Sequence, residues 1–554
     1  MQGTGDRNGT SIAAVFTVQA GGSSLSWNKD RRENLVEEFP FPHEVTVPRR
    51  DLPPFRDLRS FMSHLEREGR LVRIREPVSV VHVMTEIHRR ALRANGPALL
   101  FEAPLMPDGS PATMPVLVNL FGTTERTSWG FGVDPSSLRA LGEMLAELRE
   151  PRPPRDFADA MSKMPLARAA MTMRPKQVHA PPAQEIIWRG EQIDLTRLPV
   201  QVNWPGEPAP LLTWPLVITR RPDDAACDEV NVGVYRMQVI GRDRAIMRWL
   251  AHRGGARHHH QWKAQGKDMP VAVAIGADPA TILSAVLPLP ETLSEFRFAG
   301  LIRGERLRLS PCITVPLVAP ADAEIIIEGV VSPDETAPEG PFGDHTGYYN
   351  AVEHFPVMRV TAITMRRNPV YLSTFTGRPP DEPSRIGEVL NELFVPLVRK
   401  QLPEIVDLWL PPEACSYRIA IASIDKRYPG QARRIMLALW SLLPQLTYTK
   451  FLIVVDADIN VRDWADVAWA ISTRSDPSRD LVTLTDTPID YLDFASPRPG
   501  LGGKLGIDAT HKIGAETSRE WGRVLEMDAA VVSRVDQLWQ RLGLAEALST
   551  GPAR

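Results

Sequence analysis

The middle third of this 554-residue chain is a closely spaced series of β-prone runs, and this feature limits the possible folds more than any other. The runs are Leu211–Arg220, Asn231–Ile240, Arg244–His252, Val271–Ile275, Ala323–Val331, Phe355–Arg366 and Val370–Phe375. Gly241, Arg242 and Asp243 supply turn residues between two of them, which predicts a hairpin. The 51 prolines are scattered between apolar runs and indicate rigid loops. Antiparallel strands at this density predict a barrel or another closed sheet.

The segments on either side of this series have a different pattern of apolar residues, with helix-like segments among the strand-like ones. Before it, Asp57–Glu68 has apolar residues at helical spacing, and Met114–Phe121 predicts a buried strand. Within it, Asp278 and Pro279 predict the start of a helix. After it, strand-like and helix-like segments alternate, which predicts a parallel sheet with crossover helices. The alternating segments are Tyr417–Ile424, Ala432–Leu443, Phe451–Ile459, Trp464–Ser472 and Leu481–Leu484.

These patterns together predict the fold class α/β (α+β) and a division of the chain. Residues 1–50 mix Gly, Ser and charges without a sustained period, so we expect a flexible extension there. A Pro- and Arg-rich segment, Glu150–Arg155, is a plausible boundary. We therefore expect an α/β domain over residues 51–155, the strand-rich domain over 156–380 and a second α/β domain with a parallel sheet over 381–554.

Composition excludes several classes of function. The 64 Lys and Arg residues nearly balance the 67 Asp and Glu residues, so nothing indicates a basic surface for a nucleic acid. No apolar stretch approaches the roughly 18 residues that a membrane span requires. Residues Met1–Ser23 lack the features of a signal peptide. Three widely separated cysteines argue against a disulfide framework or a thiolate zinc site, and they fit a reducing compartment.

The most distinctive motif is Glu-Gly-Pro-Phe-Gly-Asp-His-Thr-Gly-Tyr-Tyr, at Glu339–Tyr349. Gly and Pro residues between Glu339 and Asp344 disfavour a regular helix, so the segment should form a fixed loop that aims both carboxylates into one cavity. Two neighbouring carboxylates raise at least one pKa, and an acid with a raised pKa can deliver a proton near neutral pH. A solvated loop without function is the alternative that the motif alone leaves open.

Two further segments carry side chains suited to a charged ligand. In Asn231–Arg236, an arginine that faces into a barrel would be costly to bury unless it meets carboxylates or a phosphate. An arginine at a strand end that reaches water is the alternative. Met247–Gly255 combines arginines, a flat aromatic side chain, a histidine and a Gly-Gly turn that lets a ligand approach the backbone.

Asn231, His252 and Glu295 together offer oxygen and nitrogen ligands that suit Mn²⁺ or Mg²⁺ better than a soft metal. Sequence spacing alone cannot bring these three residues together. His258–His260 is a weaker candidate, because consecutive histidines on a strand alternate faces and those on a loop are usually solvated. Gly500–Lys504 lacks the spacing and the following Ser or Thr of a phosphate-binding loop.

At this point the chain resembles the UbiD family of prenylated-FMN-dependent decarboxylases, over nearly everything from Leu58 to about Trp539. Among its branches, the chain is most similar to the 4-hydroxy-3-polyprenylbenzoate decarboxylases of bacterial ubiquinone biosynthesis. The resemblance is carried by Gly96–Glu102, Asn231–Arg236, Met247–Gly255, Gly276–Leu283, Thr292–Glu295, Glu339–Asn350, Thr376–Pro383 and Thr487–Phe494. Residues 1–50 have no counterpart in it.

The resemblance implies an N-terminal α/β domain, a central split β-barrel that holds the flavin and a C-terminal α/β domain that helps to form a homo-oligomer, a hexamer in the family. It implies that Asn231, His252 and Glu295 hold Mn²⁺, with Mg²⁺ as an alternative and K⁺ as a further ion. The residues that would line prenylated FMN are Val234, Tyr235, Arg236, Arg248, Trp249, Leu250, Arg253 and Gly254. Arg236, Glu339 and Asp344 would form the catalytic network, where many relatives carry Glu in place of Asp344.

The chemistry that follows is loss of CO₂ from an aromatic acid. Decarboxylation leaves a carbanion in an sp² orbital that no side chain can delocalise, so the cofactor must act as the electron sink. Asp344 would protonate the ring carbon, and Arg236 would orient the substrate carboxylate. A flavin prenyltransferase would supply the cofactor.

We expect 4-hydroxy-3-polyprenylbenzoate as the substrate, which also implies peripheral contact with the inner face of the cell membrane by a cytoplasmic protein. The first alternative is a decarboxylase or reversible carboxylase of a small phenolic acid such as hydroxybenzoate or vanillate. A catalytically silent flavin-binding or assembly subunit is the other alternative. It predicts loss of the acid–arginine–acid set, whereas Arg236, Glu339 and Asp344 are all present.

Overall fold

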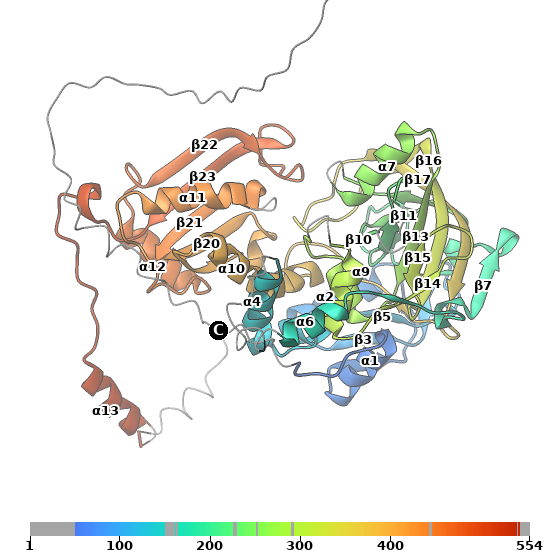
Figure 1. Cartoon of the computed structure of the whole chain (residues 1–554), viewed down its shortest axis with the longest axis horizontal. Coiled ribbons are helices and arrows are strands. Elements are labelled where there is room, and N and C mark those ends of the chain that lie inside the picture. The colour runs from blue at the N-terminus through green and yellow to red at the C-terminus, as the bar shows by residue number, and fades with distance from the viewer. Residues whose placement is uncertain are drawn as a thin grey trace, which may run out of the picture. The chain divides into compact units, whose positions relative to one another are not determined.

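All but the last of the closely spaced runs of the middle third contribute to one curled antiparallel sheet of nine strands, visible in Figure 1 around β13, β16 and β17. The computed structural model describes residues 50–149, 161, 164–224, 230–250, 253–289, 293–442, 446–539 and 541–542. All of these residues belong to one compact unit. The strands are β7 (Ile186–Arg189), β8 (Leu211–Leu212), β9 (Leu216–Thr219), β10 (Asn231–Val234), β11 (Met237–Val239), β12 (Arg244–Met247), β13 (Met269–Ile275), β16 (Ile325–Glu339) and β17 (Glu353–Met365).

The two ends of this sheet are joined by very short connections. The hydrogen-bonded path runs from β10 through β9, β13, β16, β17, β12 and β11 to β8. Nevertheless the chain passes from β8 to β9 through residues 213–215, and from β10 to β11 through Tyr235 and Arg236 alone. The sheet must therefore curl until its two ends come close. Leu211–Arg220, predicted as one strand, is two, because Pro215 has no N–H to donate to a ladder.

The longest strands, β16 and β17, carry the distinctive motif at one end. They pair in antiparallel register from Ile325 opposite Met365 to Glu339 opposite Glu353, with irregularities after Glu328 and Val331. Glu339 is thus the last residue of a strand, and only the residues after it form the predicted loop. The predicted hairpin at residues 241–243 is confirmed by the antiparallel pairing of β11 with β12.

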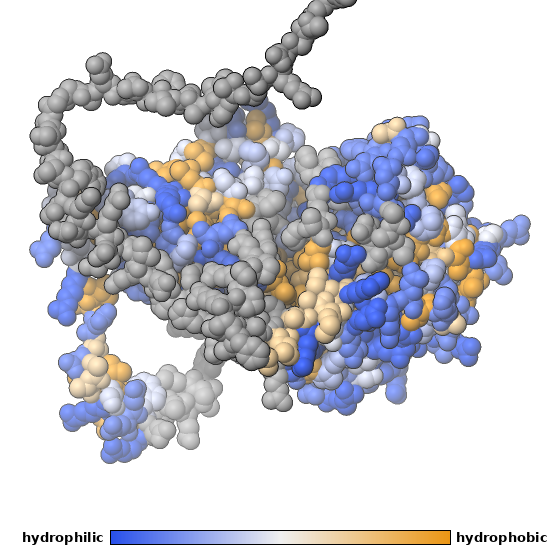
Figure 2. All heavy atoms as spheres, viewed as in Figure 1, coloured by the Kyte–Doolittle hydropathy of each residue, from blue (hydrophilic) through white to orange (hydrophobic). Residues whose placement is uncertain are grey.

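Helices and short strands complete this part of the chain. They are α6 (Met164–Met171), β6 (Lys176–Gln177), α7 (Gly254–Ala264), α8 (Pro279–Ser284), α9 (Glu295–Arg303), β14 (Arg308–Pro311) and β15 (Val318–Pro320). The predicted helix start at Asp278 is confirmed, since its side chain accepts a hydrogen bond from the Thr281 backbone at 3.2 Å. In Figure 2, apolar residues of α6 lie at the surface.

The N-terminal part is a four-stranded sheet with helices. Its elements are α1 (Leu58–Arg67), β1 (Leu71–Ile74), β2 (Val78–Ser79), α2 (Val83–Arg93), β3 (Ala98–Phe101), β4 (Pro104–Leu105), β5 (Val116–Val118), α3 (Thr124–Gly130) and α4 (Leu138–Arg149). Asp57 and Ser60 form a reciprocal capping box at the start of α1, which confirms the predicted helix. The fourth strand is β18 (Tyr371–Leu372), which pairs with β5. Val370–Phe375 was expected in the barrel, and that expectation is wrong. One continuous apolar core joins this sheet to the curled sheet.

The last third alternates as predicted around a five-stranded sheet of order β19-β20-β21-β23-β22. Its elements are α10 (Glu382–Gln401), β19 (Ile405–Trp409), β20 (Ile419–Ile424), α11 (Gln431–Leu442), β21 (Phe451–Asp456), α12 (Trp464–Arg474), β22 (Leu481–Pro488) and β23 (Leu501–Ala509). The three central strands are parallel, whereas β19 and β22 are antiparallel edges. Leu481–Leu484 was expected to join the parallel sheet, and its direction is the opposite.

Alternating residues of the central strands feed two separate cores. In β21, Leu452 and Val454 pack with the residues of α11, and Ile453 and Val455 pack with those of α12. The last helix, α13 (Ala529–Trp539), has no buried residue. None of the described helices has the length and apolar character that crossing a membrane requires. The extension predicted over residues 1–50, apart from Arg50, and the boundary segment 150–155 lie outside the described residues.

Candidate functional site

Arg236 lies in the two-residue connection between β10 and β11, where the ends of the curled sheet meet. Its Nε and Nη2 atoms donate to the two carboxylate oxygens of Glu339 at 2.8 and 3.2 Å. Its Nη1 atom donates to Oδ2 of Asp344 at 3.1 Å. Nη2 also donates to Oδ1 of Asn350 at 2.7 Å. The predicted acid–arginine–acid network is therefore present, and the alternative of a solvated loop does not hold.

A second arginine and a distant tyrosine complete this network. Nη1 of Arg248 donates to Oε2 of Glu339 at 2.9 Å. Nη2 of Arg248 donates to the hydroxyl of Tyr491, from the segment between β22 and β23. Glu339 is only 1% exposed, so both arginines balance a carboxylate that water barely reaches. Sequence reasoning missed Asn350 and Tyr491 as members of the site, although both lie in segments that carried the family resemblance.

Asp344 is held as a hydrogen-bond acceptor on both oxygens. Its Oδ1 atom accepts from the backbone N–H of His345 at 2.7 Å and lies 2.6 Å from Nδ1 of the same residue. Burial would raise the pKa of this carboxyl, but the hydrogen bond and charge of His345, followed by the charges of Arg236 and Arg248, hold it well below its usual range. The expectation of a raised pKa is wrong for Asp344, because the contact with His345, together with the two arginines, outweighs the effect of burial.

A cradle for a negatively charged group lies beside this network. Helix α7 begins at Gly254, and the side chain of its N-cap residue, Arg253, does not cap the first backbone N–H groups. The hydroxyl of Tyr235 accepts from the N–H of Gly255 at 3.4 Å and from Nδ2 of Asn231 at 3.4 Å. A Cβ atom at Gly254 would lie 1.9 Å from Oδ1 of Asn231, so only glycine permits this approach. A phosphate fits such a helix N-terminus.

Glu295 supplies a carboxylate next to this cradle. It is the first residue of α9, and its Oε2 atom accepts from the backbone N–H of Val232 at 2.9 Å. Burial raises the pKa of Glu295 to about 7. Within the described ranges no Lys or Arg pairs with it, so a bound cation would stabilise its charge. The structure thus brings Glu295 of α9 to the backbone of Val232, which follows Asn231 on β10, while His252 lies outside the described residues.

The predicted site residues also include side chains that pack rather than donate. Trp249 is 5% exposed, and its ring lies 5.6 Å from that of His259. Leu250 packs against a small apolar cluster of β12 and β17, and Arg253 is the N-cap of α7. Val234 ends β10. No group of three His, Cys, Asp or Glu side chains in the described part of the chain could hold a metal on its own.

The histidine run and the Gly-rich run take structural positions. His258–His260 lies on helix α7, where neither predicted setting, strand or loop, applies. His258 is buried with Nδ1 3.0 Å from the Thr219 hydroxyl, and His259 is buried as well. In Gly500–Lys504, the Lys504 ammonium donates to backbone carbonyls of Thr449 and Pro488 at 3.2 Å each. The Lys504 ammonium thus serves the C-terminal sheet, as expected for a run that is not a phosphate loop.

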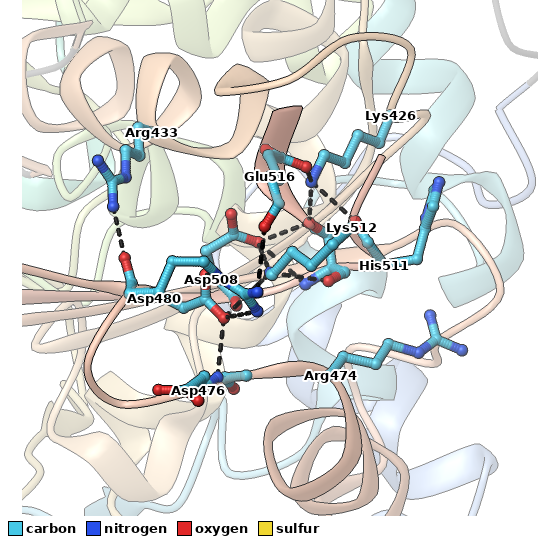
Figure 3. A network of polar contacts seen from close by, with 12 residues as sticks. Lys426, Arg433, Arg474, Asp476, Asp480, Asp508, His511, Lys512 and Glu516 are labelled. Carbon is cyan, nitrogen blue, oxygen red and sulfur yellow. Dashed lines mark hydrogen bonds and ion pairs between the residues drawn. The ribbon is translucent and has the colours of Figure 1, made fainter. Parts of the chain in front are cut away.

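A larger polar cluster lies at the carboxyl ends of the parallel strands in the C-terminal sheet (Figure 3). Ligands often bind at such an edge in α/β folds. Here, however, the charges are matched within the cluster. Lys426 donates to Glu516 at 2.7 Å, and Lys512 donates to Asp508 at 2.9 Å, with both ammonium groups fully buried. We therefore assign this cluster to the stability of the sheet.

Comparison with known proteins agrees with the geometry of the barrel site. Three models of 3-octaprenyl-4-hydroxybenzoate carboxy-lyase match the chain: the N-terminal domain at residues 62–145, the Rift-related domain at 175–379 and the C-terminal domain at 384–509. The UbiD-class enzyme HmfF from Pelotomaculum thermopropionicum, solved in complex with FMN, is 30% identical, with a TM-score of 0.69 over 84% of this chain and 96% of that one. The chain belongs to the UbiD family.

Other UbiD-like structures share the fold. The closed form of vanillic acid decarboxylase from Sedimentibacter hydroxybenzoicus is 25% identical, with a TM-score of 0.75 over 88% of this chain and 99% of that one. The 3,4-dihydroxybenzoic acid decarboxylase AroY from Klebsiella pneumoniae is 23% identical with a TM-score of 0.68, a likeness of fold over 86% of this chain and 98% of that one. The UbiD protein described here is thus a carboxy-lyase, and its α/β fold with a curled central sheet is confirmed.

Proposed function

We propose that this UbiD protein decarboxylates 4-hydroxy-3-polyprenylbenzoate to 2-polyprenylphenol in ubiquinone biosynthesis, with prenylated FMN and Mn²⁺. The observation that carries the proposal is the arginine of the β10–β11 connection, which binds Glu339 and Asp344 beside a helix N-terminus and a buried glutamate. The descriptions of all three matching domains name a polyprenylated 4-hydroxybenzoate, which favours this substrate.

The residues of the network divide the work of binding and proton transfer. Arg236 uses four of its five N–H donors within the described residues, and the remaining one is on Nη1 beside Asp344. That donor can bind the substrate carboxylate and hold the scissile bond next to the acid. Glu339, fixed by Arg236 and Arg248, keeps the guanidinium of Arg236 in this orientation. Asp344 delivers the proton to the ring carbon that loses CO₂.

The cradle fits the phosphate of the cofactor. The N–H groups at the start of α7 and the hydroxyl of Tyr235 would hold the phosphate, and Asn231, Glu295 and His252 would hold Mn²⁺ against it. Mg²⁺ is an alternative ion for this ligand set, and K⁺ a further one. Prenylated FMN, when bound, supplies the electron sink for decarboxylation.

The alternative substrate is a small phenolic acid. The vanillic acid and 3,4-dihydroxybenzoic acid decarboxylases share the fold over most of their length, which favours this alternative. The same network would serve either acid, because both reactions end in protonation of an aromatic carbon. The difference between the two functions therefore depends on which ring substituent the site accepts.

Co-expression with a flavin prenyltransferase tests the proposal. We expect CO₂ release from 4-hydroxybenzoates that carry a 3-prenyl or longer chain, and much slower release from the unprenylated acid and from vanillate. Asp344→Asn should abolish turnover while flavin absorbance of the purified protein remains. Turnover of the unprenylated acids alone would refute the quinone assignment. Full activity of Asp344→Asn would refute the assignment of the acid.

We also propose a cytoplasmic homo-oligomer, a hexamer by family resemblance, with peripheral contact at the inner face of the membrane. The segment that includes α13 supports self-association. Leu525 is 99% exposed and Met527 is 70% exposed, and Figure 2 shows further apolar surface on the helix. Its charges balance, with Arg519, Arg523, Arg534 and Arg541 against Glu520, Glu526, Asp528 and Asp536. A surface without a basic excess suits a second copy of the chain better than an anionic bilayer.

A further inference from the structure

The acid of the site is paired with its own neighbour in the chain. Asp344 and His345 share a contact of 2.6 Å between Oδ1 and Nδ1, and the backbone N–H of His345 reinforces it at 2.7 Å. The other oxygen, Oδ2, accepts from Arg236 at 3.1 Å. Both oxygens of the carboxylate are thus directed at donors. In this arrangement Asp344 is an anion that cannot by itself supply a proton.

The contact with Asp344 favours the protonated form of the histidine ring. Burial would lower the pKa of His345, but the hydrogen bond and charge of Asp344 raise it above its ordinary value. The same contact is the main reason that the pKa of Asp344 falls. The side chain of His345 is 23% exposed, so water can reach the ring from the side that does not face Asp344.

Other charged groups act on the pair from several elements. Two of them come from the barrel, Arg236 in the β10–β11 connection and Arg248 after β12. Others come from the last third of the chain, where Arg418 lowers and Asp490 raises the pKa of His345. Asp381, the N-cap of α10, also interacts with His345. These groups include both signs, so the contact with Asp344 decides the charge of the ring.

We propose that His345 is the proton reservoir of the site and recharges Asp344 in every turnover. The inference rests on the proposed function, in which Asp344 protonates the ring carbon. The bond from the ring carbon to the carboxyl carbon breaks, CO₂ leaves, and the electron pair remains with the ring. The Nδ1 proton of His345 passes to Asp344, and Asp344 gives this proton to the ring carbon. Neutral His345 then takes one proton from water, so one proton is consumed for each CO₂ released.

A proton-supplying role of His345 differs from a purely structural role because it makes kcat depend on the charge of the ring, and therefore on pH. His345 loses its proton as the pH rises through its raised pKa, so kcat should fall on the alkaline side, with a midpoint above about 6.5. A histidine that only orients Asp344 through its N–H group would leave kcat independent of its own charge. His345 is a positioning residue in this sense, because it acts on the substrate only through Asp344.

The test uses holoenzyme co-expressed with the prenyltransferase and the variant His345→Asn, whose amide N–H can replace Nδ1 as a donor without titrating. We expect kcat at pH 7.5 to fall about 10- to 100-fold, KM to change less than about twofold, and kcat to recover as the pH is lowered. The matched control is His354→Asn, an exposed histidine on β17, which should leave the pH profile unchanged. Wild-type kcat and pH profile in His345→Asn would overturn the proposal.

A second measurement does not depend on turnover. In holoenzyme with ¹³C-labelled histidine, the His345 signal is assigned by its loss in His345→Asn. It should titrate above about 6.5 and shift to lower pH in Asp344→Asn. Titration at or below 6.5, or no shift in Asp344→Asn, would also overturn the proposal. Failure of the proposed function is recognised separately, because wild-type holoenzyme would then release no CO₂ from any of the acids.

Discussion

Replacement of Arg236 by lysine separates the charge of this residue from its shape. Lysine keeps the positive charge but has one nitrogen in place of three, so it cannot bind Glu339 through two atoms and also reach Asp344 and Asn350. Hydrogen bonds to charged groups contribute about 1.5–3 kcal/mol each, so a loss of two would cost about 3–6 kcal/mol. Arg248 still binds Glu339 in the variant, and the side chain of Arg236 is 14% exposed. Water and Arg248 therefore restore part of the lost hydrogen-bond energy. We expect a net cost of about 2–3 kcal/mol.

The energetic cost of Arg236→Lys should be measurable both in the stability of the loop that carries Asp344 and in kcat. Amide hydrogen exchange in residues 340–350 should accelerate about 30- to 140-fold, which corresponds to the same 2–3 kcal/mol. We expect kcat to fall about 100-fold or more, because the acid and the substrate carboxylate lose their common anchor. The control is Arg242→Lys on the β11–β12 hairpin, where the arginine is 64% exposed and lies 3.2 Å from Asp194. If Arg236→Lys keeps kcat within about threefold of wild type, or if both variants alter exchange equally, the reasoning is refuted.

Two further predictions concern the last third of the chain. Lys512→Met removes a fully buried ammonium from Asp508 and Asp480. The free energy of unfolding of the C-terminal sheet, measured in urea at pH 7, should fall by about 3 kcal/mol. The control variant Lys267→Met, at an exposed lysine, should change it by almost nothing. The pKa of Asp480 is lowered, so its stabilising contribution is present above its ordinary pKa and is lost as the pH falls. The difference between wild type and Lys512→Met should therefore persist down to the ordinary pKa of Asp480, 3.8, and shrink below it, and a constant difference would contradict the assignment. A chain that ends at Glu520 lacks α13 and should form a smaller assembly than the full chain in light scattering, whereas an unchanged mass would place the interface elsewhere.

Local signals in the sequence identified much of the fold. The helical spacing over Asp57–Glu68, the Asp278-Pro279 helix start and the turn at residues 241–243 depend only on residues close in the chain, and all three are confirmed. The alternation of the last third was likewise readable, since strands and helices have different apolar periods. The sheet to which β18 belongs was not readable, because β18 pairs with β5, which is distant in the chain. The direction of β22 was not readable either, because it depends on the antiparallel pairing with β23.

For the candidate site too, some features were predictable from the sequence and others depended on contacts in space. The motif at Glu339–Asp344 and the arginine at 236 were recognisable as chemistry-bearing residues, and the family resemblance placed them in one network. What the sequence could not decide was the charge state of the acid. Two neighbouring carboxylates predicted a raised pKa. The pKa of Asp344 is instead lowered, first by the contact with the adjacent His345 and then by Arg236, which is distant in the chain and 3.1 Å away in space.

The sequence alone thus determined where most elements begin and end and the family, and it predicted the residues that carry the chemistry. The tertiary structure decided that Leu211–Arg220 divides between two strands that do not pair with each other, that Tyr491 reaches Arg248, and that Asp344 lies against both His345 and Arg236. The physical reason is that propensity and capping act along the chain, whereas Coulombic and hydrogen-bond energies depend on distance in space and on burial.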